Sequence, residues 1–425
     1  MNYQEAIDFL FPLHRFGIKP GLDRVLRLLK ASGEPQRNLG RVFHIAGTNG
    51  KGSVACALAA MFRAAGYRTA LYTSPHLLSF TERMRVDGTA IDETKVGEYC
   101  SMLKPAIEAE KATFFEATTA IAFRFFSDMA VDVSVIETGM GGRLDATNVV
   151  RPESVVIPTI GRDHTGWLGE TPAAIAAEKA AIIKQGAKVY TGVFQPEALQ
   201  PILDGAAANG CSVTVLPGRG ACTVTKSGIG ELEFSLFMGD CRMSGLRAPL
   251  TGEFQARNLS LAVLAARDAG LDDEVVRNGL LTIRENGYRA RLERLSLLPD
   301  LLVDVSHNPD GVRGSVDALM HSGERFGHVF VVLGLAEDKD AVAVVRELKP
   351  LKPHVVTVRL SSRRGRAAEL LGDVCRGEGV RVTVSGTVGE GLRQALCMAS
   401  PNDLVLATGS FYLAGEVLAL TGVRV

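Results

Sequence analysis

The chain has 425 residues, more than one hydrophobic core usually organises, which predicts about two or three domains. Its 46% hydrophobic and 22% charged residues exclude a disordered chain, and 47 Lys and Arg against 47 Asp and Glu leave no basic excess for a nucleic-acid partner. The seven scattered Cys residues never show CxxC spacing, the first residues lack a signal-peptide pattern, and no apolar run has membrane-spanning length. We therefore expect a cytoplasmic protein with free thiols and no membrane contact.

The first part of the chain predicts a parallel sheet covered by helices. Residues 1–36 are predicted to be helical, and strand-like runs then alternate with helical patterns from Arg41 to about Lys188. Residues 211–248 change to short alternating segments, which predicts a small β-rich insertion, followed by a helix over 255–269. The predicted strands of the first sheet are 42–46, 69–72, 131–136 and 155–160, and those of the insertion include 213–216 and 231–237.

A second alternating series begins near Leu301 and is typical of a compact Rossmann-like domain. Because Asn286-Gly287 interrupts the pattern, we expect the domain boundary between Arg284 and Pro299. The predicted fold class is α/β: a P-loop ATPase domain over residues 1–288, and a smaller Rossmann-like domain over 289–425. The predicted strands of the second domain are 301–305, 329–333, 355–358, 380–384 and 404–407.

A glycine-rich segment between the first strand and its helix indicates a phosphate-binding loop. Its main-chain N–H groups can face an anion, and the helix N-terminus adds positive charge. Lys51 can reach the β- and γ-phosphates and Ser53 can bind magnesium, although Gly52 separates them and makes the loop a variant. A plain glycine-rich connector is the disfavoured alternative. The predicted nucleotide-binding residues here are Gly47, Thr48, Asn49, Gly50, Lys51, Gly52, Ser53 and Val54.

Polar side chains also follow the next three strands, where parallel sheets bind ligands. Ser74 follows the second strand, Glu137 ends the third, and His164 follows the fourth. Magnesium prefers hard oxygen ligands, so Glu137 with Ser53 and Ser74 is a predicted magnesium site. His164 is a less expected ligand, and a hydrogen-bonded structural imidazole is an equally good interpretation of it. The glycines at 139–142 favour a loop that approaches the substrate.

The second domain has polar groups at its strand ends too. Asp304 and His307 follow the strand from Leu301, and Ser410 follows the last strand. Such groups can simply cap the next helix. Polar strand ends in both domains instead favour a ligand cleft between the domains.

In their order along the chain, these segments resemble the folylpolyglutamate synthase/dihydrofolate synthase family of the Mur ligase superfamily. Each segment by itself is weak, but the ordered set is specific and runs nearly end to end. The matching segments are residues 17–24 (GIKPGLDR), 47–53 (GTNGKGS), 72–77 (YTSPHL), 82–83, 115–116, 141–148 (GGRLDATN), 163–164, 178–180 (EKA), 255, 258, 291–293 (RLE), 304, 307–309 (HNP), 338–340 (DKD) and 409–410.

The resemblance implies an ATP-dependent ligase that joins a dihydropteroate or reduced folate carboxylate to the amine of L-glutamate through an acyl phosphate. Its implied catalytic residues are Lys51, Lys179, which this family carbamylates, and His307. Its implied metal ligands are Ser53, Ser74 and Glu137 for one Mg²⁺ and His164 for a second. Beyond the nucleotide loop, the residues implied to contact ATP are Asn258, in the helix after the insertion, and Arg291 and Asp304, in the second domain. Its implied substrate contacts are Gly21, Leu22, Asp23, Thr113, Phe114, Phe115, Glu116, Leu144, Asp145 and Ala146 for the pterin, and Ser410 for glutamate.

Other readings of the sequence remain open. One alternative is a cell-wall amino-acid ligase of the same superfamily, which usually carries a nucleotide-sugar domain before the phosphate loop. Only 46 residues precede the loop in this sequence, which disfavours that alternative. A P-loop switch ATPase and an inactive folate-binding protein are further alternatives. The segment 163–169 (DHTGWLG) resembles bifunctional bacterial members, so we expect both synthase activities, in a monomer.

Two departures from the family pattern affect the second domain. Ser306 stands where an alanine is usual before His307, beside the strand implied to contact ATP. Residues 288–291 (YRAR) replace the more usual Trp-Pro-Gly-Arg, which leaves the choice between Arg289 and Arg291 open.

Overall fold

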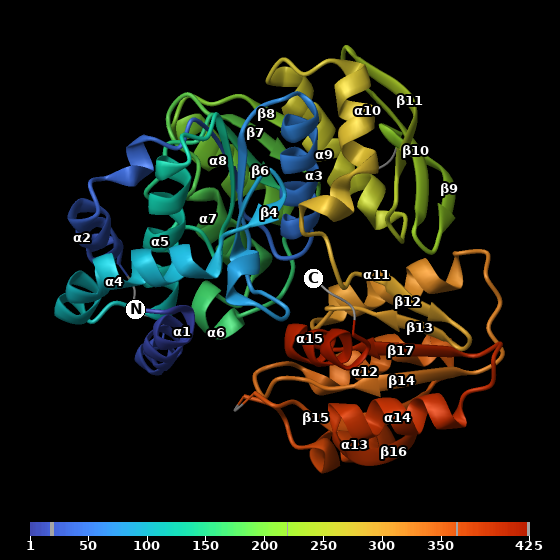
Figure 1. Ribbon diagram of the computed structural model, residues 1–425. Coiled ribbons are helices and arrows are strands. Elements are labelled where there is room, and N and C mark those ends of the chain that lie inside the picture. The colour runs from blue at the N-terminus through green and yellow to red at the C-terminus, as the bar shows by residue number, and fades with distance from the viewer. Residues whose placement is uncertain (18–20, 219, 363, 423–425) are drawn as a thin grey trace. The chain divides into compact units, whose positions relative to one another are not determined.

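The computed structural model describes residues 1–17, 21–218, 220–362 and 364–422 (Figure 1). They form two compact units. The N-terminal unit comprises Met1–Cys222, Leu236–Met243 and Arg257–Gly287, and the C-terminal unit comprises Thr223–Ser235, Ser244–Ala256 and the chain from Tyr288 onward. Within the described residues, no helix combines the length and the apolar character needed to cross a membrane.

An eight-stranded sheet organises the N-terminal unit, in the order β4-β3-β2-β5-β1-β6-β7-β8. Strands β2, β5, β1, β6, β7 and β8 are parallel, and β3 and β4 add an antiparallel edge. The strands are β1 (Arg41–Ile45), β2 (Thr69–Tyr72), β3 (Met84–Val86), β4 (Thr89–Ala90), β5 (Val133–Glu137), β6 (Ser154–Ile157), β7 (Lys188–Thr191) and β8 (Val213–Val215). The carboxyl ends of β2, β5, β1 and β6 therefore lie next to one another.

The run 213–216 was expected in the β-rich insertion, and this prediction is wrong. The run forms β8, which pairs in parallel with β7 at the edge of the large sheet. Helix α8 (Pro196–Ala208) connects the two strands as a crossover. A strand of three residues has no periodicity of its own, so its sequence does not indicate which sheet it joins.

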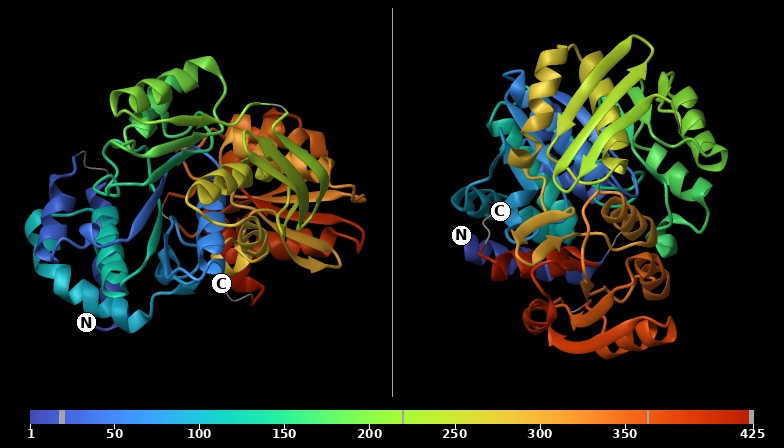
Figure 2. Two further views of the ribbon diagram at one scale, coloured as in Figure 1. Left: turned by 90° about the horizontal axis from the view of Figure 1, so that it is seen from above. Right: turned by 90° about the vertical axis from the view of Figure 1, so that its right-hand side faces the viewer.

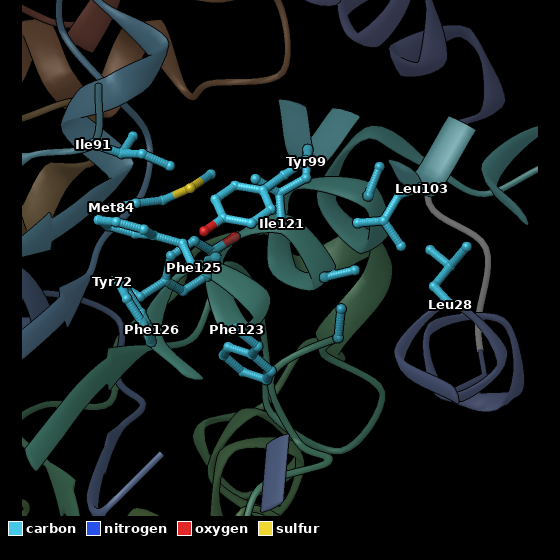
Figure 3. Close-up of a cluster of buried hydrophobic side chains, with 14 of the residues drawn as sticks. Leu28, Tyr72, Met84, Ile91, Tyr99, Leu103, Ile121, Phe123, Phe125 and Phe126 are labelled. Atoms are coloured by element: carbon cyan, nitrogen blue, oxygen red, sulfur yellow. The ribbon is translucent and has the colours of Figure 1, made fainter. Parts of the chain in front are cut away.

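The inner strands β5 and β1 are buried on both sides because helices cover both faces of this sheet. A large apolar cluster packs around Tyr72, Phe123 and Phe126 (Figure 3). The other helices of the N-terminal unit are α1 (Tyr3–Leu10), α2 (Asp23–Ala31), α3 (Lys51–Ala64), α4 (Glu93–Glu110), α5 (Phe114–Asp128), α6 (Thr165–Leu168), α7 (Pro172–Ala180) and α10 (Asp273–Leu281), with α9 (Phe254–Asp268) beginning in the C-terminal unit. Short 3-10 helices cover Phe11–Phe16, Pro35–Arg37, Phe80–Arg83, Ile283–Asn286 and Lys349–Leu351.

The predicted β-rich insertion is a three-stranded sheet in the order β11-β10-β9. Its strands are β9 (Cys222–Gly228), β10 (Glu231–Met238) and β11 (Cys241–Ala248), and Figure 2 shows them side by side. Gly230 and Gly239 have positive φ in the two connecting turns, where side chains other than glycine are strained. The insertion thus begins later than expected.

A six-stranded sheet in the order β12-β13-β17-β14-β15-β16 organises the C-terminal unit. All its pairs are parallel except the β12–β13 edge pair, which the sequence pattern did not reveal. The strands are β12 (Glu293–Leu297), β13 (Asp300–Val303), β14 (Val329–Leu333), β15 (His354–Arg359), β16 (Arg381–Thr387) and β17 (Leu404–Thr408). The helices are α11 (Pro309–Met320), α12 (Ala341–Leu348), α13 (Ala368–Gly377), α14 (Val388–Met398) and α15 (Phe411–Leu420).

Candidate active site

The predicted phosphate loop connects β1 to α3, and the segment that follows β6 holds it in place. Thr48 N donates to Thr159 O over 2.9 Å, and Gly161 N donates to Thr48 Oγ1 over 3.0 Å. Lys51 Nζ donates to Gly47 O and Thr48 O over 3.0 and 3.3 Å, so the lysine side chain folds back over its own loop. Its ammonium group therefore lies where the loop would cradle a phosphate.

Asn258 on α9 lies directly over the phosphate loop. A Cβ atom added at Gly50 would come within 2.5 Å of Asn258 Oδ1, and Gly50 also has a positive φ of +86°. Gly50 is thus the residue that lets α9 approach the loop. This contact places a predicted ATP-binding residue beside the predicted phosphate site, although the two are far apart in the sequence.

The predicted metal ligands Glu137 and Ser74 are brought together at the ends of β5 and β2. Glu137 is 4% exposed, and its Oε2 accepts a hydrogen bond from Ser74 N over 3.0 Å. The register pairs Glu137 with Ile45, one residue before the nucleotide loop begins to turn. Ser53 is buried in the first turn of α3. One buried carboxylate together with serine hydroxyls is a donor set that suits Mg²⁺, which keeps waters and substrate phosphates as its other ligands.

His164 follows the end of β6 and precedes α6. Its φ is +51°, and its Nε2 lies 3.9 Å from Asp163 Oδ1. In the part of the chain that the structure describes, no group of three or more His, Cys, Asp or Glu side chains forms a metal cluster. The role of His164 as a second-metal ligand therefore stays a prediction.

Lys179 is buried, unlike an ordinary surface lysine. It lies near the end of α7 and is 4% exposed. Burial lowers the pKa of its ammonium group to about 7, and the positive charge of Lys51 acts in the same direction. Asp163 and Asp145 oppose this shift. At pH 7 the amine is therefore neutral in about half of the molecules, and the neutral amine is the form of a lysine that can act as a nucleophile.

The loop at residues 139–148, which we call the substrate loop, folds around the Asp145 carboxylate. Asp145 Oδ2 accepts hydrogen bonds from Gly139 N and Met140 N, both over 2.9 Å. Its Oδ1 accepts from Thr147 N and Thr147 Oγ1 over 3.0 and 2.5 Å. Burial raises the pKa of Asp145. These hydrogen bonds give Asp145 a structural role in shaping the loop. The resemblance separately implies that Asp145 contacts the substrate.

Gly142 lets the substrate loop pack on α7. A Cβ atom there would lie 2.6 Å from Glu178 O and 2.9 Å from Lys179 O, both main-chain atoms that cannot move aside. We expect Gly142→Ala to destabilise the fold by about 1–3 kcal/mol and to lower ligase activity by displacing the loop. Urea unfolding and steady-state rates measure both effects. Gly166→Ala, where a Cβ meets open space, is the matched control.

Three predicted pterin-side segments contact one another in the N-terminal unit. Arg24, in the first turn of α2, forms an ion pair with Glu116 of α5 over 3.0 Å, across 92 positions of sequence. A Cβ at Gly139 would come within 2.5 Å of the Phe115 ring, so the substrate loop lies on that ring. Gly21, Leu22 and Asp23 precede or begin α2, while residues 18–20 of the same motif lie outside the described residues.

Thr113, Phe114 and Glu116 also have structural roles. Thr113 and Glu116 form the capping box of α5, in which each side chain accepts a main-chain N–H of the other residue. The Phe114 ring stacks on His14 with centroids 4.0 Å apart. Leu144 is exposed and Ala146 is buried on the substrate loop. Of this group, Leu144 is the side chain most accessible to a ligand.

Glu82 holds the loop that carries Ser74. Its carboxylate accepts hydrogen bonds from Leu77 N and Leu78 N, both over 2.8 Å, and from Ser79 N over 2.6 Å. We expect Glu82→Gln to lower the free energy of unfolding by about 2–3 kcal/mol, because an amide cannot accept all three bonds with a full negative charge. Urea unfolding checks this, with the exposed Glu93→Gln as control. An unchanged unfolding midpoint would contradict this role.

In the C-terminal unit, Asp304 lies at the end of β13 and is 2% exposed. Its carboxylate accepts from Ser315 Oγ over 2.7 Å and from Leu292 N over 3.3 Å. His307 Nδ1 lies 2.9 Å from Val305 O, and because a carbonyl only accepts, Nδ1 carries a proton. Ser410 caps α15 by accepting from Tyr412 N.

The segment 288–291 gives its two arginines different partners. Arg289 Nε forms an ion pair with Glu293 over 2.8 Å. The Arg291 guanidinium lies over the Tyr288 ring, 5.2 Å from its centroid, and donates to Arg289 O. Arg289 is therefore held by a carboxylate, which favours Arg291 as the arginine for a phosphate.

Sequence reasoning missed the buried interactions that join these segments. His44, near the carboxyl end of β1, contacts Thr147 of the substrate loop, and Arg24 contacts Glu116. The only available signal for His44 was an imidazole inside an otherwise apolar strand.

Two family models match the chain. Residues 45–266 match the Mur ligase middle domain, and residues 290–411 match the Mur ligase glutamate ligase domain. A dihydrofolate synthase/folylpolyglutamate synthase of Bacillus subtilis is 33% identical over 433 residues, which cover 98% of each chain. A probable bifunctional folylpolyglutamate synthase/dihydropteroate synthase of Haloferax volcanii is 35% identical over 431 residues, and the chain spans about half of its length (50%).

Solved structures match as well. The Mycobacterium tuberculosis folylpolyglutamate synthase complexed with ADP has a TM-score of 0.89 and 31% identity, covering 98% of this chain and 99% of that one. A bifunctional folylpolyglutamate synthase/dihydrofolate synthase with Mn, AMPPNP and L-glutamate bound has a TM-score of 0.85 and 31% identity, covering 99% and 98%.

The two sheets, the nucleotide loop and the two domain matches define an ATP-dependent amino-acid ligase of the Mur type. Within that class, the identity extends over the full length of a curated relative. The chain belongs to the folylpolyglutamate synthase/dihydrofolate synthase family.

Proposed function

We propose that this enzyme is bifunctional and adds L-glutamate both to dihydropteroate and to the γ-carboxylate of reduced folates, with conversion of ATP to ADP and phosphate. One observation carries the proposal. The nucleotide loop and the Glu137 carboxylate, which accepts a hydrogen bond from Ser74 N, lie at the carboxyl ends of neighbouring strands, and the buried amine of Lys179 is close enough to feel the charge of Lys51. That combination suits phosphoryl transfer to a carboxylate, which requires mainly positioning and neutralised charge.

The reaction has two steps. The substrate carboxylate attacks the γ-phosphorus of ATP, which forms an acyl phosphate and releases ADP. The amine of L-glutamate then attacks the acyl carbon, forms the amide and expels phosphate. The main-chain N–H groups of the nucleotide loop and Lys51 Nζ hold the phosphates in line for the first step and neutralise their charge.

The oxygen-rich end of the large sheet would hold Mg²⁺. Ser53, Ser74 and Glu137 would bind the first ion, and His164 would help to bind a second. When bound, Mg²⁺ neutralises charge that develops on the transferred phosphoryl group. Support comes from the hydrogen bond that fixes Glu137 beside Ser74 and from the solved relative with Mn bound.

We propose that Lys179 is carbamylated. Its neutral amine attacks the carbon of CO2, which forms an N–C bond and releases a proton, so a buried neutral amine becomes an anionic carbamate. The support is the burial of Lys179 near Lys51, since a negative carbamate relieves the like-charge repulsion that two lysines would have.

The remaining assignments divide between the two parts of the chain. We propose that residues 1–288 bind ATP phosphates and the pterin substrate, and that residues 289–425 form the glutamate-ligase domain. Asn258, Arg291 and Asp304 would contact ATP, and His307 and Ser410 would lie near the incoming glutamate. The two family matches support this division. We also propose a cytoplasmic monomer, which size-exclusion chromatography would test.

Phosphate release from ATP in the presence of L-glutamate tests the proposed function. Three reactions are compared: with 7,8-dihydropteroate, with a reduced monoglutamyl folate, and with neither. We expect release with each pterin and none without. Release with only one pterin would restrict the enzyme to one activity. Release with neither would contradict the proposal and favour a peptide-ligase substrate.

A further inference from the structure

The N-terminal unit contains a buried polar chain that the proposed mechanism does not use. His44, the next-to-last residue of β1, is fully buried, and its Nε2 lies 2.8 Å from Thr147 Oγ1. Thr147 Oγ1 in turn lies 2.5 Å from Asp145 Oδ1. These three side chains connect the strand that leads into the nucleotide loop with the substrate loop.

The direction of the hydrogen bonds follows from the partners. Four donors point at the two oxygens of Asp145, so this carboxylate accepts, and the Thr147 hydroxyl donates to it. The Thr147 oxygen then accepts from His44 Nε2–H. Burial lowers the pKa of His44 to about 3, so the imidazole is neutral and carries its single proton on Nε2. The nearby positive charge of Lys184 acts in the same direction.

An imidazole is an unexpected side chain at this position of a buried strand. Among the described residues His44 Nδ1 is a buried atom with no hydrogen-bond partner. Leaving such an acceptor unpaired is unfavourable, and an apolar side chain would avoid the loss. A buried polar side chain that costs stability is expected where the residue contributes to a functional site.

The chain of bonds ends on the main chain beside the predicted metal ligand. Asp145 Oδ2 accepts hydrogen bonds from the N–H groups of Gly139 and Met140, which lie two and three residues after Glu137. At its other end, His44 lies two residues before Ala46 and pairs in register with Ile136 of β5. The substrate loop and the nucleotide loop therefore share one internal set of hydrogen bonds.

We infer that His44 is a positioning residue that, through Thr147 and Asp145, holds the substrate loop in the conformation that binds the pterin substrate. The inference rests on the proposed function and on the pterin contact that the family resemblance implies for Leu144, Asp145 and Ala146. It assigns no contact between His44 and any substrate. Its effect is on the substrate loop, and the ATP phosphates should be bound as before.

Two pairs of variants test the inference. Thr147→Val removes the hydroxyl at constant shape, and Thr147→Ser restores it. His44→Phe removes the donor, and His44→Gln returns an N–H near the original Nε2. We expect Thr147→Val and His44→Phe to raise the KM for the pterin substrate by about tenfold, a loss typical of one buried hydrogen bond, with the KM for ATP within about twofold. Thr147→Ser should recover the wild-type value, and His44→Gln part of it.

Trp167 supplies a readout that needs no catalysis. It is the single Trp of the sequence, it is 58% exposed, and it lies on α6. The next residue of α6, Leu168, packs against the substrate loop, since a Cβ built at Gly141 would lie 2.9 Å from the Leu168 side chain. We expect its fluorescence emission to change in Thr147→Val and to return in Thr147→Ser.

The outcomes are distinct. An unchanged pterin KM and unchanged Trp167 emission in both Thr147→Val and His44→Phe would overturn the inference. Equal increases of both KM values together with a lower unfolding midpoint would also overturn it, since that pattern indicates a residue that only stabilises the fold. If wild type itself lacked pterin-dependent ADP formation, the proposed function would fail, while the Trp167 comparison would still test the hydrogen-bonded chain.

Discussion

Lys51→Ala is expected to all but abolish ATP turnover. Lys51 Nζ lies 3.0 Å from Gly47 O, over the loop that would hold the phosphates, and it is the charged side chain of that loop. Removing one preorganised positive group from a phosphoryl-transfer site lowers kcat by about 10²–10³-fold. The measurement is ADP formation with saturating pterin and L-glutamate.

The exposed Lys95 of α4, paired with Glu98, provides a matched control. Lys95→Ala should keep wild-type turnover. That result would show that the loss of activity in Lys51→Ala does not come from losing one positive charge anywhere on the protein. Full activity in Lys51→Ala would contradict the phosphate loop and with it the assignment of the reaction.

Lys179→Met is expected to lower kcat by a comparable factor of about 10²–10³-fold. The variant keeps the volume of the buried side chain but cannot form the carbamate. A small carboxylate such as formate should restore part of the activity, since it can occupy the space and supply the missing negative charge. Lys179→Arg should remain inactive in both conditions, because a guanidinium stays positive.

Lys188→Met is the control for this position, as Lys188 of β7 is an exposed lysine whose Nζ donates to Asp268 O, away from the site. It should retain activity. Mass spectrometry of native protein prepared under CO2 should show the added carboxyl group on wild type and not on Lys179→Met. Full activity of Lys179→Met without added carboxylate would exclude a catalytic carbamate.

The pH dependence of stability provides a further test in CO2-free buffer. The folded-state pKa of Lys179 is lowered to about 7 from an ordinary value of 10.5, so between these values the unfolded chain binds more protons than the folded one. The free energy of unfolding of wild type should therefore rise with pH across this window, relative to Lys179→Met. Urea titrations at both ends of the window measure it. A pH-independent difference between the two proteins would show that Lys179 is not titrating abnormally.

Local patterns predicted most of the elements near the site. The helix after the nucleotide loop and the helix over 255–269 both form, as Lys51–Ala64 and Phe254–Asp268. Those predictions succeeded because a glycine-rich turn and an apolar period are properties of neighbouring residues. The β8 strand was assigned to the wrong sheet because strand partners are chosen by burial and crossover geometry.

The order of the residues was enough to predict the chemistry of the site: a lysine and a hydroxyl in a phosphate loop, a carboxylate at the end of the third predicted strand, and an ordered set of motifs that resembles one family of ligases. The folded chain was needed to find that Lys179 is buried near Lys51, that Arg24 binds Glu116, and that His44 reaches Asp145 through Thr147. This division arises because residue type and spacing fix which groups the chain contains. Burial and long-range packing fix which of them meet and what charge they carry.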